Sequence, residues 1–122
     1  MDRLFFGLGA ISAFIAVAAG AFGAHGLKGR LTPDMLTVFE TGVRYHMYHA
    51  LALIAAGWAY SRWPTSLVAG SGWLFVIGTI LFSGSLYVLS ISGIRWLGAI
   101  TPFGGLAFLA GWLCLAWSAL QK

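Results

Sequence analysis

Charged side chains are scarce in this chain of 122 residues. Asp, Glu, Lys and Arg make up 8% of it, with three acids against seven Lys and Arg, whereas a soluble domain is typically about 25% charged. This composition excludes an intrinsically disordered chain, a nucleic-acid-binding module and an ordinary soluble enzyme. The cations are scattered singly and form no basic stripe, so nucleic acid is not expected as a partner.

Cysteine is nearly absent, since Cys114 is the single one. One cysteine excludes an internal disulfide, a CxxC redox pair and a zinc site built on thiolates. Acids are missing from the long apolar stretches, so Ser83 and Ser85 have no carboxylate partner there for nucleophilic catalysis. Cys114 itself lies in an apolar segment, which disfavours a thiolate. The sequence therefore predicts a protein that is not an enzyme, with no catalytic residue, no metal site and no cofactor.

Apolar residues are abundant, at 60% of the chain with a mean hydropathy of +0.88. A helix needs about 20 apolar residues to cross the hydrocarbon core of a bilayer. Three of the four long uncharged runs are long enough to cross this core alone. The second run is shorter, but an amphipathic segment before it extends its helix into the membrane interface. The sequence predicts an all-α, four-transmembrane-helix bundle in one domain over residues 1–122. The expected helices are at about 3–26, 33–61, 66–91 and 102–120.

Capping signals support these helix boundaries. Thr32-Pro33 and Thr101-Pro102 each combine a side chain that can cap a helix with a proline suited to its first turn. The first apolar run, with Ala19-Gly20-Ala21 near its end, also has features of a cleavable secretory signal. Because the preceding Asp2-Arg3 has almost no net positive charge, we interpret this run as a transmembrane helix.

Small residues recur at four-residue spacing, as in Gly9 with Ala13 and Ala107 with Gly111. In lipid such residues allow helices to approach closely, and we attribute the pattern to packing within one bundle. A homo-oligomer face, or a face for another membrane protein, is the alternative interpretation. Membrane lipids are the expected partners in either case.

Polar side chains are distributed unevenly between the two ends of the predicted bundle. With four alternating spans, four segments place hydrogen-bonding groups at the end opposite the termini, and the terminal end has little comparable. This asymmetry predicts a binding site in one leaflet. The candidate residues are His25, Glu40, Arg44, Tyr45, His46, His49, Ser83, Ser85, Tyr87 and Thr101.

Helical spacing refines the expected geometry of this site. Glu40 and Arg44 are i,i+4 in the order that favours an ion pair, so we expect them at its mouth, as a pair or with Arg44 directed to a phosphate. His49 lies roughly 8 Å along the axis from Arg44, which is interfacial depth. We expect at least two of the three histidines to face protein, because a polar group in hydrocarbon otherwise lacks a partner. The alternative is an interfacial belt of His and Tyr with no shared site.

Several sequence blocks resemble a known family. They are Gly20-Ala21-Phe22-Gly23-Ala24-His25, residues 41–51, Leu81-Phe82-Ser83-Gly84-Ser85-Leu86-Tyr87 and Thr101-Pro102-Phe103-Gly104-Gly105. Together they are similar to the YgdD/YwdK-like small integral membrane proteins, a domain-of-unknown-function family, over essentially the whole chain. The resemblance implies a multi-pass protein of the bacterial inner (plasma) membrane with no established activity and no catalytic residues. It also implies cytoplasmic termini, which the nearly equal positive charge at the two ends leaves undecided.

Three functions are compatible with these features. The first is a non-enzymatic membrane protein whose polar residues bind a lipid headgroup, a small amphiphile or a partner protein. The second is metal or haem binding by His25, His46 and His49, since imidazole is a common metal ligand. The third is a small four-helix transporter, although proton-coupled export needs an ionisable group deep in the membrane and no spanning run contains an acid.

Overall fold

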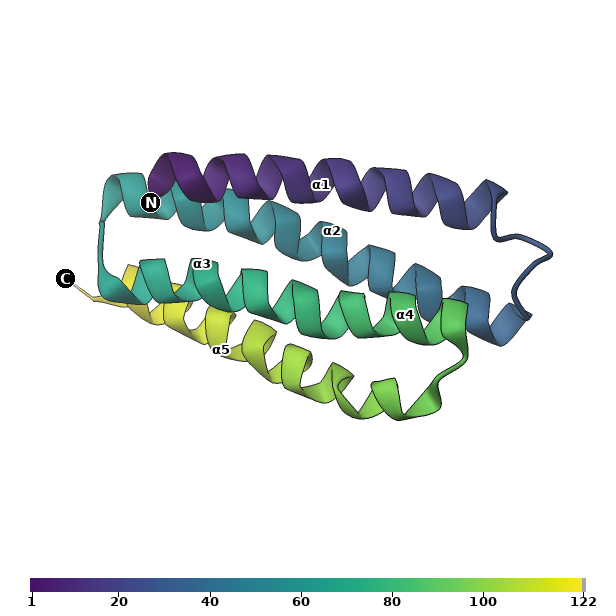
Figure 1. Cartoon of the computed structure of the whole chain (residues 1–122). Helices are drawn as coiled ribbons and strands as arrows, with labels where there is room; N and C mark the ends of the chain where they lie inside the picture. The colour runs from purple at the N-terminus through teal and green to yellow at the C-terminus, as the bar shows by residue number, and fades with distance from the viewer. Residues whose placement is uncertain (122) are drawn as a thin grey trace.

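Four long helical segments joined by short connections form the computed structural model, which describes residues 1–121 (Figure 1). In chain order the elements are α1 (Asp2–His25), α2 (Pro33–Arg62), α3 (Ser66–Gly78), the π-helical turn η1 (Thr79–Ser83), α4 (Gly84–Ser92), the 3-10 turn η2 (Arg95–Ala99) and α5 (Thr101–Leu120). Within the described residues there is no strand. The predicted all-α fold is confirmed, and each expected helix boundary agrees with the structure to within one residue.

Side-chain caps explain where two of the segments begin. The Thr32 hydroxyl accepts a hydrogen bond from the Met35 amide (3.2 Å), and Pro33 occupies the first turn of α2. The Thr65 hydroxyl caps α3 in the same way, from the Val68 amide (3.3 Å). Thr101 does not act as the expected cap, because it is already the first residue of α5 and has no capping hydrogen bond.

The sequence predicts one helix over residues 66–91, but the structure divides this segment into α3, η1 and α4. Its π-helical turn η1 interrupts the helix between Gly78 and Gly84. Such turns are rare and occur most often as single-turn bulges inside α-helices. At the end of this one, the buried Ser83 hydroxyl donates to the Gly42 carbonyl of α2 (2.7 Å). The turn thus places a polar group against the backbone of a neighbouring helix.

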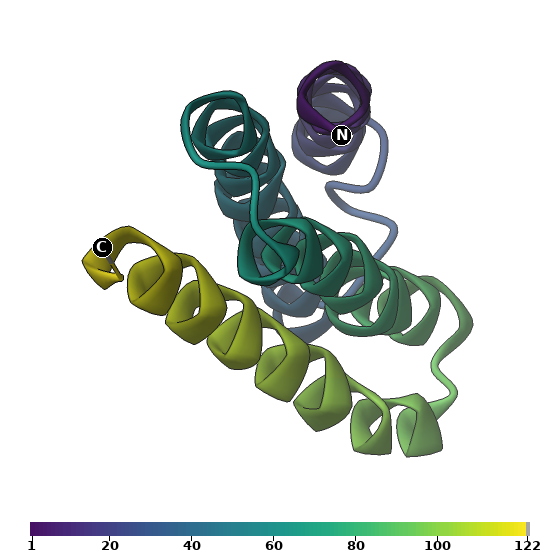
Figure 2. The same ribbon diagram turned by 90° about the vertical axis from the view of Figure 1, so that its left-hand side faces the viewer.

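The bundle is open rather than closed on itself. α1 packs along α2, α2 packs on α3, η1 and α4, and α3 packs on α5. In the end-on view of Figure 2, α1 and α5 lie on opposite sides of the molecule, with α2 and α3 between them. The buried core joins α1, α2, α3 and α5 through Phe5, Ala52, Leu53, Ala56, Phe75 and Phe108.

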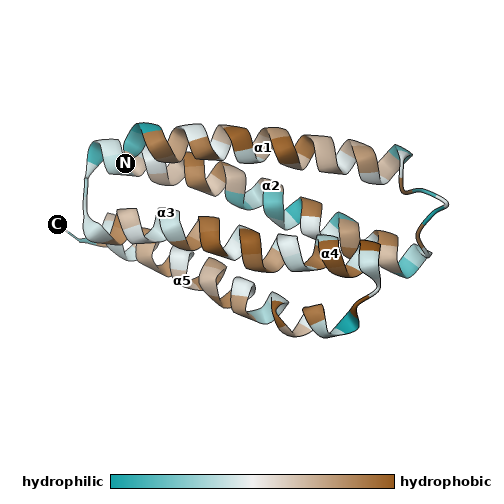
Figure 3. Ribbon diagram, in the orientation of Figure 1, coloured by the Kyte–Doolittle hydropathy of each residue, from teal (hydrophilic) through white to brown (hydrophobic). Residues whose placement is uncertain are grey.

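Three helical segments are long and apolar enough to cross a membrane, namely Asp2–His25, Ser66–Ser92 and Arg95–Leu120. α2 is the longest helix, with 30 residues, but it is more polar than these three. Figure 3 shows hydrophilic residues near the middle of α2, where the other helices are mostly hydrophobic. The crossing of the membrane by α2 as a fourth span stays a prediction.

Glycine permits the close contact between α1 and α2. A Cβ added at Gly9 would lie 2.8 Å from the Ala50 carbonyl oxygen, and one added at Gly57 would lie 2.7 Å from the Asp2 carbonyl oxygen. Both are backbone atoms that cannot rotate away. Asp2 therefore lies beside Gly57 and Gly9 beside Ala50, which fixes the antiparallel register of the two helices.

This register yields a first testable prediction. Gly9→Ala is expected to lower the free energy of unfolding by about 1–3 kcal/mol, because the added methyl group forces the helices apart. Gly7→Ala is the matched control, since nothing lies within 4 Å of a Cβ at Gly7 in the same helix. Unfolding by SDS titration in detergent measures both. Equal stability of the two variants would contradict the close α1–α2 contact.

Candidate functional site

His46 of α2 is buried between two other helices. One ring nitrogen, Nδ1, lies 2.9 Å from the Tyr87 hydroxyl of α4, and the other, Nε2, lies 2.9 Å from the Ser12 hydroxyl of α1. A hydroxyl can donate or accept, so these partners suit either ring tautomer. Tyr87 also packs its ring against Phe39, with the ring centroids 5.0 Å apart. His46 thus joins α1, α2 and α4 through side chains alone.

His49, one turn further along α2, is buried against α5. Its Nδ1 lies 2.8 Å from the Tyr45 carbonyl oxygen, and its Nε2 accepts a hydrogen bond from the Trp112 indole N–H (3.1 Å). Because a carbonyl only accepts, these partners assign the hydrogen to Nδ1. The ring also stacks on Phe108, with centroids 3.5 Å apart and an interplanar angle of 7°. Both nitrogens and one ring face are therefore engaged by protein.

Both buried histidines lie near the middle of the bundle's length. His46 contacts Ser12, which is near the middle of α1, and His49 contacts Trp112, which is near the middle of α5. The interfacial depth expected for His49, counted from Arg44 along a single helix, stays a prediction. Its level along the bundle is set by the register of α2 against α1, which places Ala50 beside Gly9.

The hydroxyl groups expected at the site make separate contacts. Ser83 donates to the Gly42 carbonyl of α2, whereas Ser85 and Thr101 hydrogen-bond to each other (2.6 Å) and join α4 to α5. Tyr87 contacts a histidine through its hydroxyl, and Tyr45, the fifth predicted residue with a hydroxyl, does so through its backbone carbonyl. The structure therefore forms several polar contacts among neighbouring helices in place of one continuous cluster.

Three predicted residues lie away from the histidines. His25 is exposed at the end of α1, and Glu40 and Arg44 are exposed on α2. The expected ion pair is absent: within residues 1–121 the only pair within 4.0 Å joins the Met1 ammonium and Asp2. Glu40 and Arg44 instead line a separate hollow beside Gly20. Of the three histidines, two are buried in protein, as expected.

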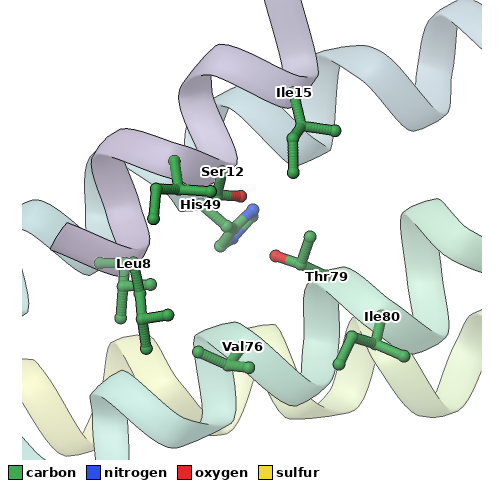
Figure 4. Close-up of a pocket in the computed structure, with 9 residues that line it drawn as sticks. Leu8, Ser12, Ile15, His49, Val76, Thr79 and Ile80 are labelled. Carbon is green, nitrogen blue, oxygen red and sulfur yellow. The ribbon is translucent and has the colours of Figure 1, made fainter. Parts of the chain in front are cut away.

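Two grooves flank His49, and the open packing of the helices explains both. The first, of about 200 Å³, lies between α1 and α3 over α2. Figure 4 shows Ser12, His49 and Thr79 directed toward this space, with Leu8, Ile15, Val76 and Ile80 around them.

The second groove, of about 480 Å³, lies between α2 and α5 and is called here the aromatic groove. It is lined by Tyr45, Tyr48, His49, Phe82, Gly105, Phe108, Leu109 and Trp112. Six of these eight side chains have aromatic rings. The Tyr45 and Tyr48 rings also pack against each other, with centroids 5.6 Å apart.

Sequence reasoning missed several residues that form these sites. Ser12 had a usable signal, because it is the one polar side chain in the apolar run before His25. Its hydrogen bond to a histidine follows from the cost of leaving a polar group unpaired in hydrocarbon. Trp112 and Phe108 had no such signal in the sequence, because they were indistinguishable from other aromatic residues in an apolar helix.

Apolar helices that bury their polar groups against one another define a small helical membrane protein. The chain belongs to the family described as "Protein of unknown function (DUF423)", whose model matches residues 19–105. It is 48% identical over 120 residues to UPF0382 membrane protein YwdK of Bacillus subtilis (strain 168), covering 98% of each chain. It is 49% identical over 119 residues to UPF0382 membrane protein SH2409 of Staphylococcus haemolyticus (strain JCSC1435), covering 98% of this chain and 97% of that one. The predicted family is confirmed, and no solved structure matches.

The contacts of His46 yield a second prediction. Ser12→Ala and Tyr87→Phe are each expected to lower the free energy of unfolding by about 0.5–1.5 kcal/mol, the range for hydrogen bonds between membrane helices. Both losses should disappear in a His46→Ala background, because the shared partner is gone. SDS titration measures the cycle, with the exposed Ser66→Ala as a control. If each variant loses the same free energy of unfolding with and without His46, these hydroxyls do not bond to His46.

Proposed function

We propose that this protein is a non-enzymatic membrane protein that binds a small amphiphile in the aromatic groove. The observation that carries the proposal is the groove itself, about 480 Å³ in volume and walled largely by aromatic rings. Ligand sites typically measure about 300–1,000 Å³ and combine apolar walls with a few polar groups. The groove has both properties.

The lining indicates the kind of molecule that fits. Flat rings pack well against aromatic side chains in offset or edge-to-face arrangements. Tyr45 and Tyr48 are partly exposed, and their hydroxyls can donate to an acceptor on the ligand. Gly105 leaves room along one wall, since a Cβ there would meet only the Phe82 ring, at 3.9 Å. A flat ring with hydrogen-bond acceptors and an alkyl tail in lipid satisfies these features.

A binding function has more support than the alternatives. For metal or haem, His25 lies apart from His46 and His49, whose nitrogens all have protein partners. Within residues 1–121 no three His, Cys, Asp or Glu side chains are grouped to hold a metal ion. For a proton-coupled transporter, the acids Asp2, Asp34 and Glu40 lie outside the apolar runs. For an enzyme, His49 has no free nitrogen to act as a base.

We place the chain in the bacterial inner membrane, where lipid surrounds it, as one domain over residues 1–122. In this arrangement α2 is a fourth membrane span. Both termini are cytoplasmic in this arrangement. The even number of helical segments supports termini on one side, and the family resemblance supports the cytoplasmic side.

Filling the aromatic groove tests the proposed function. Gly105→Leu is expected to lower the affinity for a decyl-substituted benzoquinone at least tenfold, because the leucine side chain occupies the space of the ring. Isothermal titration in detergent micelles measures binding, with Gly70→Leu as the matched control, since nothing lies within 4 Å of a Cβ at Gly70 on α3. The proposal is wrong if the native protein does not bind this probe, or if both variants bind it equally well.

Cysteine labelling tests the orientation. In a Cys114→Ala background, Lys28→Cys between α1 and α2 is expected to react with a membrane-impermeable maleimide on intact cells. Pro64→Cys, between α2 and α3, should react only after lysis, because this connection shares the side of the termini. The reverse pattern would place the termini outside, and equal labelling would contradict α2 as a membrane span.

A further inference from the structure

Glu40 and Arg44 line a hollow at the end of the α1–α2 seam, and the aromatic groove contains neither residue. This hollow, called here the Arg44 hollow, has a volume of about 280 Å³ and is lined by Gly20, Phe39, Glu40, Val43 and Arg44. Both charged side chains are exposed. The hollow exists because Gly20 has no side chain, and a Cβ there would come within 3.3 Å of Val43.

The two charges are close in sequence but do not neutralise each other. Within the described residues, no Arg44 nitrogen comes within 4.0 Å of a Glu40 oxygen. A pocket of comparable size at the opposite end of the seam, about 230 Å³, is lined by Asp2 and Arg3. There the acid is already paired, with the Met1 ammonium at 3.9 Å. The Arg44 hollow thus offers a free cation and a free anion side by side.

The position of the hollow matches the headgroup region of a bilayer. Gly20 lies in the second turn from the end of α1, close to the connection that contains Lys28 and Arg30. Residues three, four and seven apart share one face of a helix. Val17 is three residues before Gly20 and Leu51 is seven after Arg44, and both are exposed. The charged hollow therefore continues into an apolar seam toward the middle of the bundle.

We propose that the Arg44 hollow binds a phospholipid whose headgroup has both a phosphate and a primary ammonium, such as phosphatidylethanolamine. The Arg44 guanidinium binds the phosphate, for which its planar donors are well matched. The Glu40 carboxylate accepts hydrogen bonds from the ammonium, and the acyl chains follow the apolar seam past Val17 and Leu51. A headgroup with a phosphate but no ammonium, such as that of phosphatidylglycerol, would satisfy Arg44 and leave Glu40 without a cationic partner.

Lipid competition tests this assignment. The purified protein is exchanged with equal amounts of phosphatidylethanolamine and phosphatidylglycerol bearing the same palmitoyl and oleoyl chains, and bound lipid is counted by native mass spectrometry. The native protein should prefer phosphatidylethanolamine about three- to fivefold, the selectivity that one exposed charge pair supplies. Glu40→Gln should reduce the ratio of the two lipids to about one, and Arg44→Gln should lower the binding of both.

Two control variants keep the test specific. Asp34→Asn removes an exposed acid from the first turn of α2, and Arg95→Gln removes an exposed cation from η2. Both should retain the native preference. The assignment is overturned if the native protein binds the two lipids equally, if it prefers phosphatidylglycerol, or if Glu40→Gln keeps the native ratio. Gly105→Leu should leave the ratio unchanged, so this proposal and that for the aromatic groove fail independently.

Discussion

Polar side chains inside a membrane find no water in the hydrocarbon core, so they must bond to other protein groups. The two central histidines of α2 have such partners on the neighbouring helices. His46 bonds to α1 and α4, and His49 bonds to α5. In the described part of the chain, no buried side-chain nitrogen or oxygen lacks a hydrogen-bond partner. α2 thus has a central position, bonded to α1, α4 and α5 through its histidines.

This central position of α2 explains why the bundle is open. With α1 on one side of the molecule and α5 on the other, the helices do not close into a square, and spaces remain on both sides of His49. Glycines bring neighbouring helices close along the seams that do form, as Gly111 does beside Phe75. The aromatic groove thus results from the same packing that buries the histidines. A molecule bound there would contact α2 and α5 together.

The helices were predictable because single charges and proline turns delimit them almost completely, as Pro33 and Arg62 do at the two ends of α2. The burial of His46 and His49 was also predictable, from the cost of exposing imidazole to lipid. Their level along the neighbouring helices was not, because it depends on which residues of α1 face which residues of α2. That register rests on backbone contacts at Gly9 and Gly57, and a count along one helix contains no such information. The π-helical turn η1 lies between Gly78 and Gly84, and glycines in an apolar helix permit a kink without specifying its type.

Grouping Glu40, Arg44, His46 and His49 into one site failed for a reason of helical geometry. With 3.6 residues per turn, residues four apart share a face, whereas His49 lies five after Arg44 and points elsewhere. Glu40 and Arg44 consequently remain exposed, while the histidines turn inward. Exposure leaves the charged pair able to meet water or headgroups, which lowers the cost of its charges. Inward-facing imidazoles must instead satisfy both nitrogens with protein groups, as the contacts of Ser12, Tyr87 and Trp112 do. One short stretch of α2 thus serves two environments, and helical periodicity alone keeps them apart.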